Sequence, residues 1–282
     1  MSDPARGEDD TRAFFVAFIP GALIIVLAFF MYQMAFERHQ SLLNALCEGE
    51  ACWVEDHLGR GLDARAAMIE RLAAERAEGG EAWREDAVAL TTGPLKFRAV
   101  IEYDSTLAYR GVTPADLRLL STLDAGDDGV RAVALKVAAA SPGREAVVVS
   151  TAPLASGERQ VLVCAPVMRG ATRLGWVVGL VRLRDVLDEG LSLTVQRGFS
   201  AAVYEGPTLL YGANSLEGGP GARYARDVAV LRGPLLWRVQ LWPAEDLAHE
   251  YESQAPQELF VSSLLLAFFV ALSLYLWRRR PA

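Results

Sequence analysis

The residues of this chain that could carry catalytic chemistry are few and widely separated. Its three histidines, His39, His57 and His249, lie in segments with a helical pattern, and none has a metal-ligand spacing or a phosphoacceptor context. Ser200 follows Gly198, but no later glycine completes the nucleophile elbow of a hydrolase. We therefore expect no enzymatic activity.

Glycine-rich and cysteine-containing segments do not supply a cofactor or metal site either. Residues 218–221 read Gly-Gly-Pro-Gly, without the Gly-Lys-Ser that a phosphate-binding loop requires, and a surface turn is expected. Cys47, Cys52 and Cys164 are too few for a disulfide scaffold and form no CxxC pair. A bridge between Cys47 and Cys52 would require their helix to break at Gly49. We expect no metal and no cofactor.

Charge and hydropathy favour a membrane over nucleic acid. The 282 residues carry a formal net charge of −7, and no basic stripe appears outside the extreme C-terminus, so binding to a phosphate backbone is not expected. Hydrophobic residues make up 52% of the chain. Much of this excess lies in two blocks, one near each end.

Each block, Ala13–Tyr32 and Leu259–Trp277, has about the length of a helix that crosses a hydrocarbon core of about 30 Å. The acidic flank of the first block favours an uncleaved anchor over a signal peptide. Three arginines, 278–280, follow the second block, and short basic flanks stay cytoplasmic. We expect a two-pass protein of the inner membrane, with both termini cytoplasmic and the main domain periplasmic or extracellular.

The segment after the first block is helical in pattern, although Gly59 and Gly61 are expected to break it in two. Apolar residues recur at intervals of three and four, with Glu and Arg between them. Such a stripe must pack on the folded domain or on the same helix of a second subunit. We expect a homodimer through this stripe, which comprises Leu42, Leu43, Leu46, Val54, Leu58, Leu62, Ala66, Ile69 and Leu72.

Beyond this helix the pattern changes to short alternating or β-branched runs separated by glycine and polar turns, which indicates antiparallel strands and an α+β fold. Thr113 is expected to cap a short helix with Pro114 at its first position. The other expected helices are 82–90, 127–140, 183–191 and 244–253. The expected strands are 97–102, 146–149, 160–166, 174–183, 199–204, 208–211, 226–231 and 236–242.

A series of short motifs occurs in order between Leu119 and Leu191. They are Leu123-Asp124, a helix near 130–140, Ala146-Val147-Val148-Val149-Ser150, Ala165-Pro166-Val167-Met168, Gly175-Trp176-Val177-Val178-Gly179 and Asp185-Val186-Leu187. In this order and spacing, the segment resembles the CHASE extracellular sensor domain of cytokinin-receptor and bacterial sensor kinases. The flanking crossings and the long outer helix also match the layout of that family.

The resemblance implies a long membrane-emerging stalk helix and two PAS-like antiparallel sheet units between the two transmembrane helices, with a small ligand in the membrane-distal unit. The implied divisions are a cytoplasmic tail 1–12, a transmembrane helix 13–32, stalk helices 33–93, a membrane-distal PAS-like unit 94–191, a membrane-proximal PAS-like unit 192–245, a linker helix 246–258, a second transmembrane helix 259–277 and a cytoplasmic tail 278–282.

Two ligand contacts are also implied by the resemblance. In the cytokinin-binding branch, the Asp of the Leu-Asp step hydrogen-bonds an adenine-type ring, and this Asp corresponds to Asp124. A backbone contact from the Ala-Val strand falls at Val148. The residues alone leave Asp124 open to a second interpretation, because it begins a run of Asp, Ala and Gly before a helix, where Asp is a common N-cap.

We therefore predict a membrane-anchored sensor that binds a small molecule outside and signals through its transmembrane helices. Family members continue into a kinase or cyclase module, so a separate cytoplasmic or membrane signalling partner is expected, or a longer chain of which this is a piece. The alternative is a non-catalytic structural or adaptor subunit of an envelope complex, whose pocket is filled by its own side chains.

Overall fold

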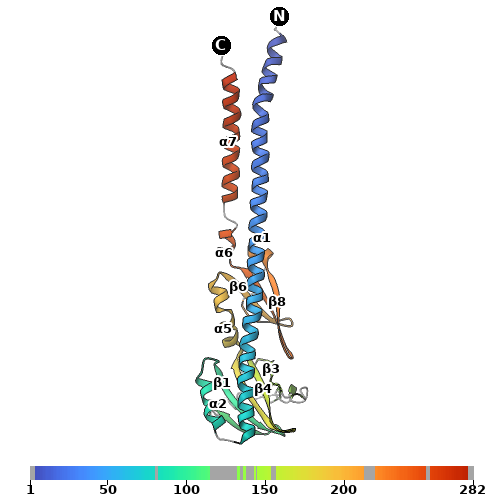
Figure 1. Cartoon of the computed structure of the whole chain (residues 1–282), viewed down its shortest axis with the longest axis vertical. Coiled ribbons are helices and arrows are strands. Elements are labelled where there is room, and N and C mark those ends of the chain that lie inside the picture. Colours follow the sequence, from blue (N-terminus) through green and yellow to red (C-terminus); the bar gives the residue numbers. More distant parts are fainter. Residues whose placement is uncertain are drawn as a thin grey trace. The chain divides into compact units, whose positions relative to one another are not determined.

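A computed structural model of the chain describes residues 4–79, 82–114, 132–133, 136–137, 143, 145–153, 157–212, 220–251 and 255–278 (Figure 1). The chain divides into two compact units. One unit comprises Met1–Leu46 and Glu245–Ala282, and the other comprises Cys47–Ala244.

The first unit is helical. It contains the beginning of α1 (Pro4–Glu78), together with α6 (Glu245–Tyr251) and α7 (Ala255–Arg278). The ring centroids of Tyr32 and Phe260 lie 5.8 Å apart, so α1 and α7 are neighbours here. Among the described residues, Ala22–Glu78 contains a stretch long and apolar enough to cross a membrane, and Phe260–Ser273 is a shorter apolar helix.

The second unit contains two antiparallel sheets. Sheet A has the strand order β2-β1-β5-β4-β3, with β1 (Phe97–Asp104), β2 (Tyr109–Thr113), β3 (Val147–Ser150), β4 (Gln160–Arg169) and β5 (Thr172–Arg182). Sheet B has the order β7-β6-β9-β8, with β6 (Phe199–Glu205), β7 (Thr208–Tyr211), β8 (Arg226–Arg232) and β9 (Leu235–Pro243). The helix α2 (Ala82–Thr92) precedes sheet A, and the 3₁₀ turn η1 (Pro220–Tyr224) precedes β8.

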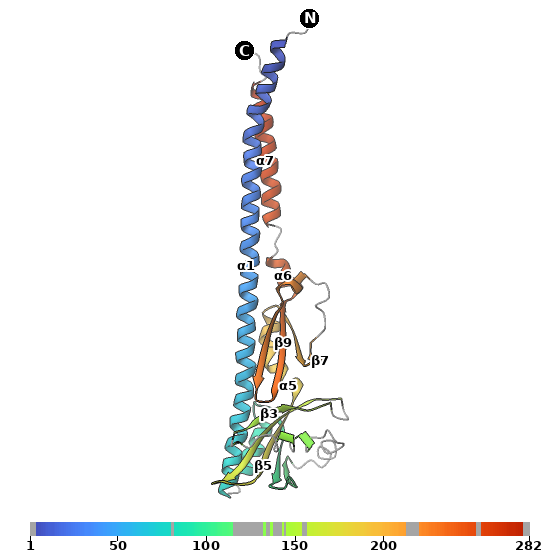
Figure 2. The same cartoon turned by 90° about the vertical axis from the view of Figure 1, so that its right-hand side faces the viewer.

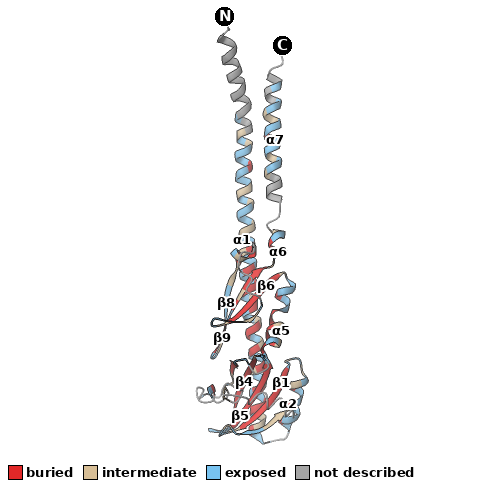
Figure 3. Cartoon of the chain, turned by 180° about the vertical axis from the view of Figure 1, so that it is seen from behind, coloured by how far each residue is buried: buried red, intermediate tan, exposed pale blue. Residues whose placement is uncertain are grey.

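The part of α1 that belongs to this unit forms one wall of a core shared by both sheets (Figure 2). Val177 and Val181 of sheet A and Trp237 of sheet B lie in this core. Buried residues gather on the inner strands and on this part of α1 (Figure 3). The α1 residues in the core are Ala51, Val54, Leu58, Leu62, Ile69, Leu72, Ala73 and Ala77.

The helix α5 (Leu183–Gln196) connects the two sheets and also packs on α1. It begins at the residue after β5 ends, and Gly198, with a φ of 85° that favours glycine, turns the chain into β6. Leu187 and Leu191 are buried in the shared core. Gly190 lies so close to Leu58 that a Cβ there would overlap the leucine side chain.

Two buried polar groups bind α1 to α5. The side chain of Arg65 is 1% exposed and donates to the carbonyl oxygens of Gly61 (3.0 Å) and Leu95 (3.2 Å) and to the Glu189 carboxylate (2.7 Å). The Glu189 side chain is 39% exposed, so water partly screens this ion pair, whereas the guanidinium of Arg65 is itself desolvated. These contacts therefore fix the position of α1 along α5.

Glu50 makes the second connection, one turn from the start of this unit. Its carboxylate accepts hydrogen bonds from the Thr194 hydroxyl (2.7 Å) and the Arg197 guanidinium (3.0 Å). The same guanidinium lies 4.6 Å from the Trp53 ring centroid. Because α1 offers Glu50 and Arg65 on the face that carries its apolar stripe, rotation of α1 would break both contacts together.

The predicted α+β class, the long N-terminal helix and the two antiparallel sheets are confirmed. Two local predictions were wrong, and the first concerns Thr113. Thr113 is the last residue of β2, paired with Val100, rather than the cap of a helix, and β2 itself was not predicted. Its sequence, Tyr-Arg-Gly-Val-Thr, has no apolar alternation, because β2 is an edge strand that is largely solvent-accessible.

The expected break of the first helix at Gly59 and Gly61 was also wrong, since α1 is continuous from Pro4 to Glu78. A Cβ at Gly59 would overlap the guanidinium of Arg232, and one at Gly61 would lie 3.4 Å from Nη1 of Arg65. Gly59 therefore makes room for Arg232, whereas the distance at Gly61 is that of an ordinary contact. Each of these glycines costs a helix about 1 kcal/mol relative to alanine, which the packing of the surrounding helix offsets.

Five residues of the predicted stripe, Val54, Leu58, Leu62, Ile69 and Leu72, pack in the shared core of their own domain, whereas Leu42 and Leu46 are exposed. A homodimer stays a prediction.

Cys52 is exposed, whereas Cys47 is buried, and both are free thiols on the continuous helix. Burial raises the pKa of Cys47.

A glycine pair tests the close contact between α1 and sheet A. A Cβ at Gly179 in β5 would lie 2.6 Å from Cδ1 of Ile69 and would overlap Phe97, whereas one at Gly111 in β2 would meet no atom within 4 Å. We expect Gly179→Ala to lower the free energy of unfolding by about 1–3 kcal/mol through overpacking. Gly111→Ala should change it by less than about 0.5 kcal/mol. Urea unfolding of the detergent-solubilised chain measures both, and equal effects would contradict the packing described.

Candidate functional site

Sheet A has a second buried face, on the side opposite α1, which we call the far face. Val133 and Val137, both in helical conformation, pack on this face, and both belong to the apolar side predicted for helix 127–140. The surface is mostly aliphatic, with two aromatic rings and one thiol, a composition suited to a small, largely apolar solute. Its buried residues are Ala99, Ile101, Tyr103, Val149, Leu162, Cys164, Trp176, Val178 and Leu180.

One polar side chain is buried at the end of the far face. Gln160 is the first residue of β4, and strand alternation places its side chain on the same face as Leu162 and Cys164. It is 0% exposed, and neither its Oε1 nor its Nε2 has a hydrogen-bond partner. Its backbone is satisfied by Thr151, whose Oγ1 accepts from the Gln160 N–H (3.1 Å) and whose N–H donates to the Gln160 carbonyl (2.9 Å).

The sequence predicted two ligand contacts, Asp124 and Val148, and only Val148 belongs to the residues that the structure describes. Val148 lies in β3, the edge strand of sheet A, and its side chain faces α1, away from the far face. Its role as a ligand contact stays a prediction.

The backbone of Val148 nevertheless points outward from the sheet. Thr151 donates to Gln160, so the alternation of antiparallel pairing leaves the N–H and C=O groups of Val148 and Ser150 directed away from β4. The Ala146 N–H follows the same pattern and donates to Glu70 of α1 (2.6 Å). A backbone contact at Val148 would therefore form at this sheet edge.

Cys164 is chemically inert in this setting. Complete burial raises the pKa of its thiol to about 12, so the reactive thiolate is absent near neutral pH. The thiol thus contributes apolar surface to the far face, as expected for a buried strand cysteine.

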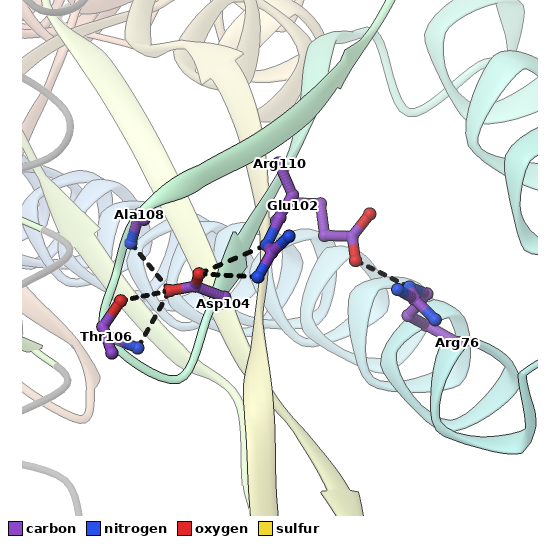
Figure 4. Close-up of polar contacts among 6 residues, drawn as sticks. All are labelled: Arg76, Glu102, Asp104, Thr106, Ala108 and Arg110. Carbon is purple, nitrogen blue, oxygen red and sulfur yellow. Dashed lines mark hydrogen bonds and ion pairs between the residues drawn. The ribbon is translucent and has the colours of Figure 1, made fainter.

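A polar cluster holds the turn between β1 and β2 (Figure 4). One oxygen of Asp104, Oδ1, accepts from the backbone N–H groups of Thr106 and Ala108 (both 2.9 Å) and from the Thr106 hydroxyl (2.6 Å). The other oxygen accepts from Arg110 Nε (3.2 Å). The hydrogen bond from the Thr106 hydroxyl, followed by that from Ala108, lowers the pKa of Asp104 from 3.8 to about 2.

Next to this turn, Arg76 of α1 donates to the Glu102 carboxylate (2.7 Å), which joins β1 to the end of α1 (Figure 4). The cavity of about 150 Å³ beside these residues is small, and Arg76, Glu102, Asp104 and Arg110 are all paired. We interpret the cluster as structural.

A larger cavity, of about 690 Å³, opens beside β6 and β7 of sheet B and is bordered by Phe199, Tyr211, Trp242 and Arg184. Its one cationic side chain, Arg184, is 85% exposed, so an anion bound there would be largely screened by water. Burial and a hydrogen bond to Asp188 raise the pKa of Tyr211. The amide of Gln160 on the far face, by contrast, is fully desolvated.

No group of three or more His, Cys, Asp and Glu side chains within the described ranges could hold a metal ion. Sequence reasoning missed Gln160 as a site residue. The sequence contained one indication of this residue. Gln160 is a polar residue directly before the apolar run Val161-Leu162-Val163-Cys164, and in a strand its side chain lies on the same face as those of Leu162 and Cys164.

The Asp104 cluster predicts a pH dependence. Because the pKa of Asp104 is lower in the folded state, its stabilising contribution is complete above pH 3.8 and is lost as the pH falls towards about 2. We expect the Tm of the wild type to fall more steeply across this window than that of Asp104→Asn. Asp56→Asn, on the exposed side of α1, is the control and should follow the wild type. Parallel Tm profiles for Asp104→Asn and the wild type would contradict the assignment.

No known protein-family profile matches the sequence, and no curated protein matches it. The structure, however, is similar to the ligand-binding domain of the Pseudomonas fluorescens chemoreceptor CtaA in complex with L-leucine, at 16% identity and a TM-score of 0.54, covering 75% of this chain and 99% of that one. The complex of the same domain with L-isoleucine matches at 16% identity and a TM-score of 0.55, covering 75% and 96%.

The ligand-binding domain of the Pseudomonas aeruginosa amino-acid chemoreceptor PctC in complex with GABA matches at 16% identity and a TM-score of 0.51, covering 71% of this chain and 99% of that one. At these identities the shared property is the fold. The long helix with two antiparallel sheets is the architecture of chemoreceptor ligand-binding domains.

Proposed function

We propose that this chain is a membrane-anchored extracytoplasmic sensor that binds a small solute on the far face of sheet A. The observation that carries the proposal is the fold. Two sheets on one long helix match nearly the full length of solved chemoreceptor domains, and those structures are complexes with L-leucine, L-isoleucine and GABA. The buried aromatic and aliphatic far face, with one desolvated amide, suits solutes of that size. The CHASE assignment in particular stays a prediction.

The membrane anchor is supported by the helical unit. Many large apolar side chains of α1 and α7, including Phe30, Met31, Phe268 and Phe269, are exposed. Contiguous exposure of this kind is unfavourable in water and is accommodated by lipid. We propose two crossings of the inner membrane, with both termini in the cytoplasm and Cys47–Ala244 outside.

Signalling would use the contacts of α1. The helix is bonded to α5 through Glu50 and Arg65 and to sheet A through Arg76 and Glu70, so a rearrangement of sheet A on solute binding acts on α1 directly. A solute with different affinities for two positions of α1 shifts the equilibrium between them. The displacement would be read by a cytoplasmic or membrane partner.

The sensing proposal is tested with the full chain in lipid nanodiscs. Thermal unfolding is followed with L-leucine, L-isoleucine, GABA or adenine, and with glycerol as a solute control. A solute at about 100 times its Kd stabilises the folded state by about 2.7 kcal/mol, so a Tm increase of several degrees is expected from at least one of the four. No shift from any of them would favour the alternative, an adaptor subunit whose far face is filled by its own side chains.

The topology is tested through Cys52, which is exposed, while the other two cysteines of the chain are buried. A membrane-impermeant maleimide added to intact spheroplasts should label the wild type and leave Cys52→Ser unlabelled. If the wild type reacts only after the spheroplasts are lysed, Cys52 is cytoplasmic and the proposed topology is wrong.

A further inference from the structure

The side chain of Gln160 is buried at a cost that its surroundings do not offset. Both of its polar atoms are desolvated, and neither has a partner. Trp237 also buries an unpaired indole N–H, but its large ring contributes apolar contact to the shared core. Gln160 has two unpaired polar atoms and only two methylene groups, so the unfavourable desolvation dominates.

Local structure does not require a glutamine at this position. The backbone of Gln160 is hydrogen-bonded to Thr151, and its side chain makes no contribution to that pairing. A leucine or methionine would fill similar volume on a face that is otherwise largely apolar. The amide therefore serves a partner that is not another residue of the described chain.

The chemistry of the amide restricts that partner. A carboxamide presents a donor, Nε2, beside an acceptor, Oε1, and both are satisfied by a solute with an acceptor and a donor on neighbouring atoms. The α-carboxylate and α-ammonium groups of an amino acid have this arrangement. The aliphatic and aromatic residues of the far face suit an apolar side chain next to them.

We propose that Gln160 orients the bound solute, and that this solute is an α-amino acid with an apolar side chain, its carboxylate accepting from Nε2 and its ammonium donating to Oε1. This inference rests on the proposed sensing function and adds the solute class and the residue that selects it.

The experiment uses calorimetry and thermal unfolding of the full chain in nanodiscs, with L-leucine as the probe. Gln160→Met should leave the Tm of the solute-free chain unchanged or raise it, and should weaken L-leucine binding about tenfold or more, because the charged groups of leucine then lose their partner. Gln240→Met, at a partly buried strand position in sheet B, is the matched control and should keep wild-type affinity.

Truncated probes test the pairing itself. 4-Methylpentanoic acid lacks the ammonium group of leucine, and isopentylamine lacks the carboxylate. Both should bind the wild type more weakly than L-leucine. If Gln160 hydrogen-bonds the ammonium and carboxylate groups, the difference in affinity between L-leucine and each probe should be smaller in Gln160→Met. Gln160→Glu retains an acceptor and loses the donor, so it should favour isopentylamine over 4-methylpentanoic acid.

The outcomes separate this inference from the sensing proposal. If the wild type responds to no solute, the sensing proposal fails. If it binds L-leucine and Gln160→Met binds it equally well, or if Gln160→Met only lowers the Tm of the solute-free chain, the amide is structural and the inference is overturned. Should Gln160→Met fail to fold, unchanged probe preference in Gln160→Glu overturns it. Binding of adenine or GABA without L-leucine would refute the solute class.

Discussion

Both sheets of the second unit bury their inner faces against the same stripe of α1, and the other features of the unit follow from this packing. Leu58 contacts Gly190 of α5, and Ile69 occupies the space that Gly179 leaves in β5. Each fully buried leucine or isoleucine contributes about 1.5–3 kcal/mol. Neither sheet can bury its inner face without α1, so the helix acts as the common support of both.

Buried charge then determines where along that support each element lies. Apolar packing alone is non-directional and would tolerate small shifts of α1. Arg65 is different, because its guanidinium is desolvated and its two partners outside α1, the Leu95 carbonyl and the Glu189 carboxylate, fit one position of the helix. A sensor that works by moving a helix needs discrete positions, and hydrogen-bonded charges of this kind create them.

Local patterns predicted most of the fold, and tertiary contacts decided the rest. The strands that become β4 and β5 were predicted because β-branched runs between glycines are unambiguous. The continuity of α1 through Gly59 was not, because the compensating contact comes from Arg232, 173 positions later in the chain. The partner of the apolar stripe was left open for the same reason, since only the assembled sheets show that Leu58 and Leu62 are covered.

The candidate site was harder to predict because its signal depends on which face of a strand is buried. On the face of sheet A that packs against α1, residues such as Val163 and Val177 contribute apolar packing, and Val148 is one of these residues. The opposite face carries Tyr103, Trp176 and the desolvated amide of Gln160. Alternation places the side chain of Gln160 on the same face as Leu162 and Cys164. From the sequence alone, however, a polar residue at the end of a strand is equally well explained as a solvent-exposed strand end, until the burial of both faces is known. Once the burial is known, the unpaired amide among apolar neighbours is recognisable as a cost to stability, and the proposed role of Gln160 rests on this observation.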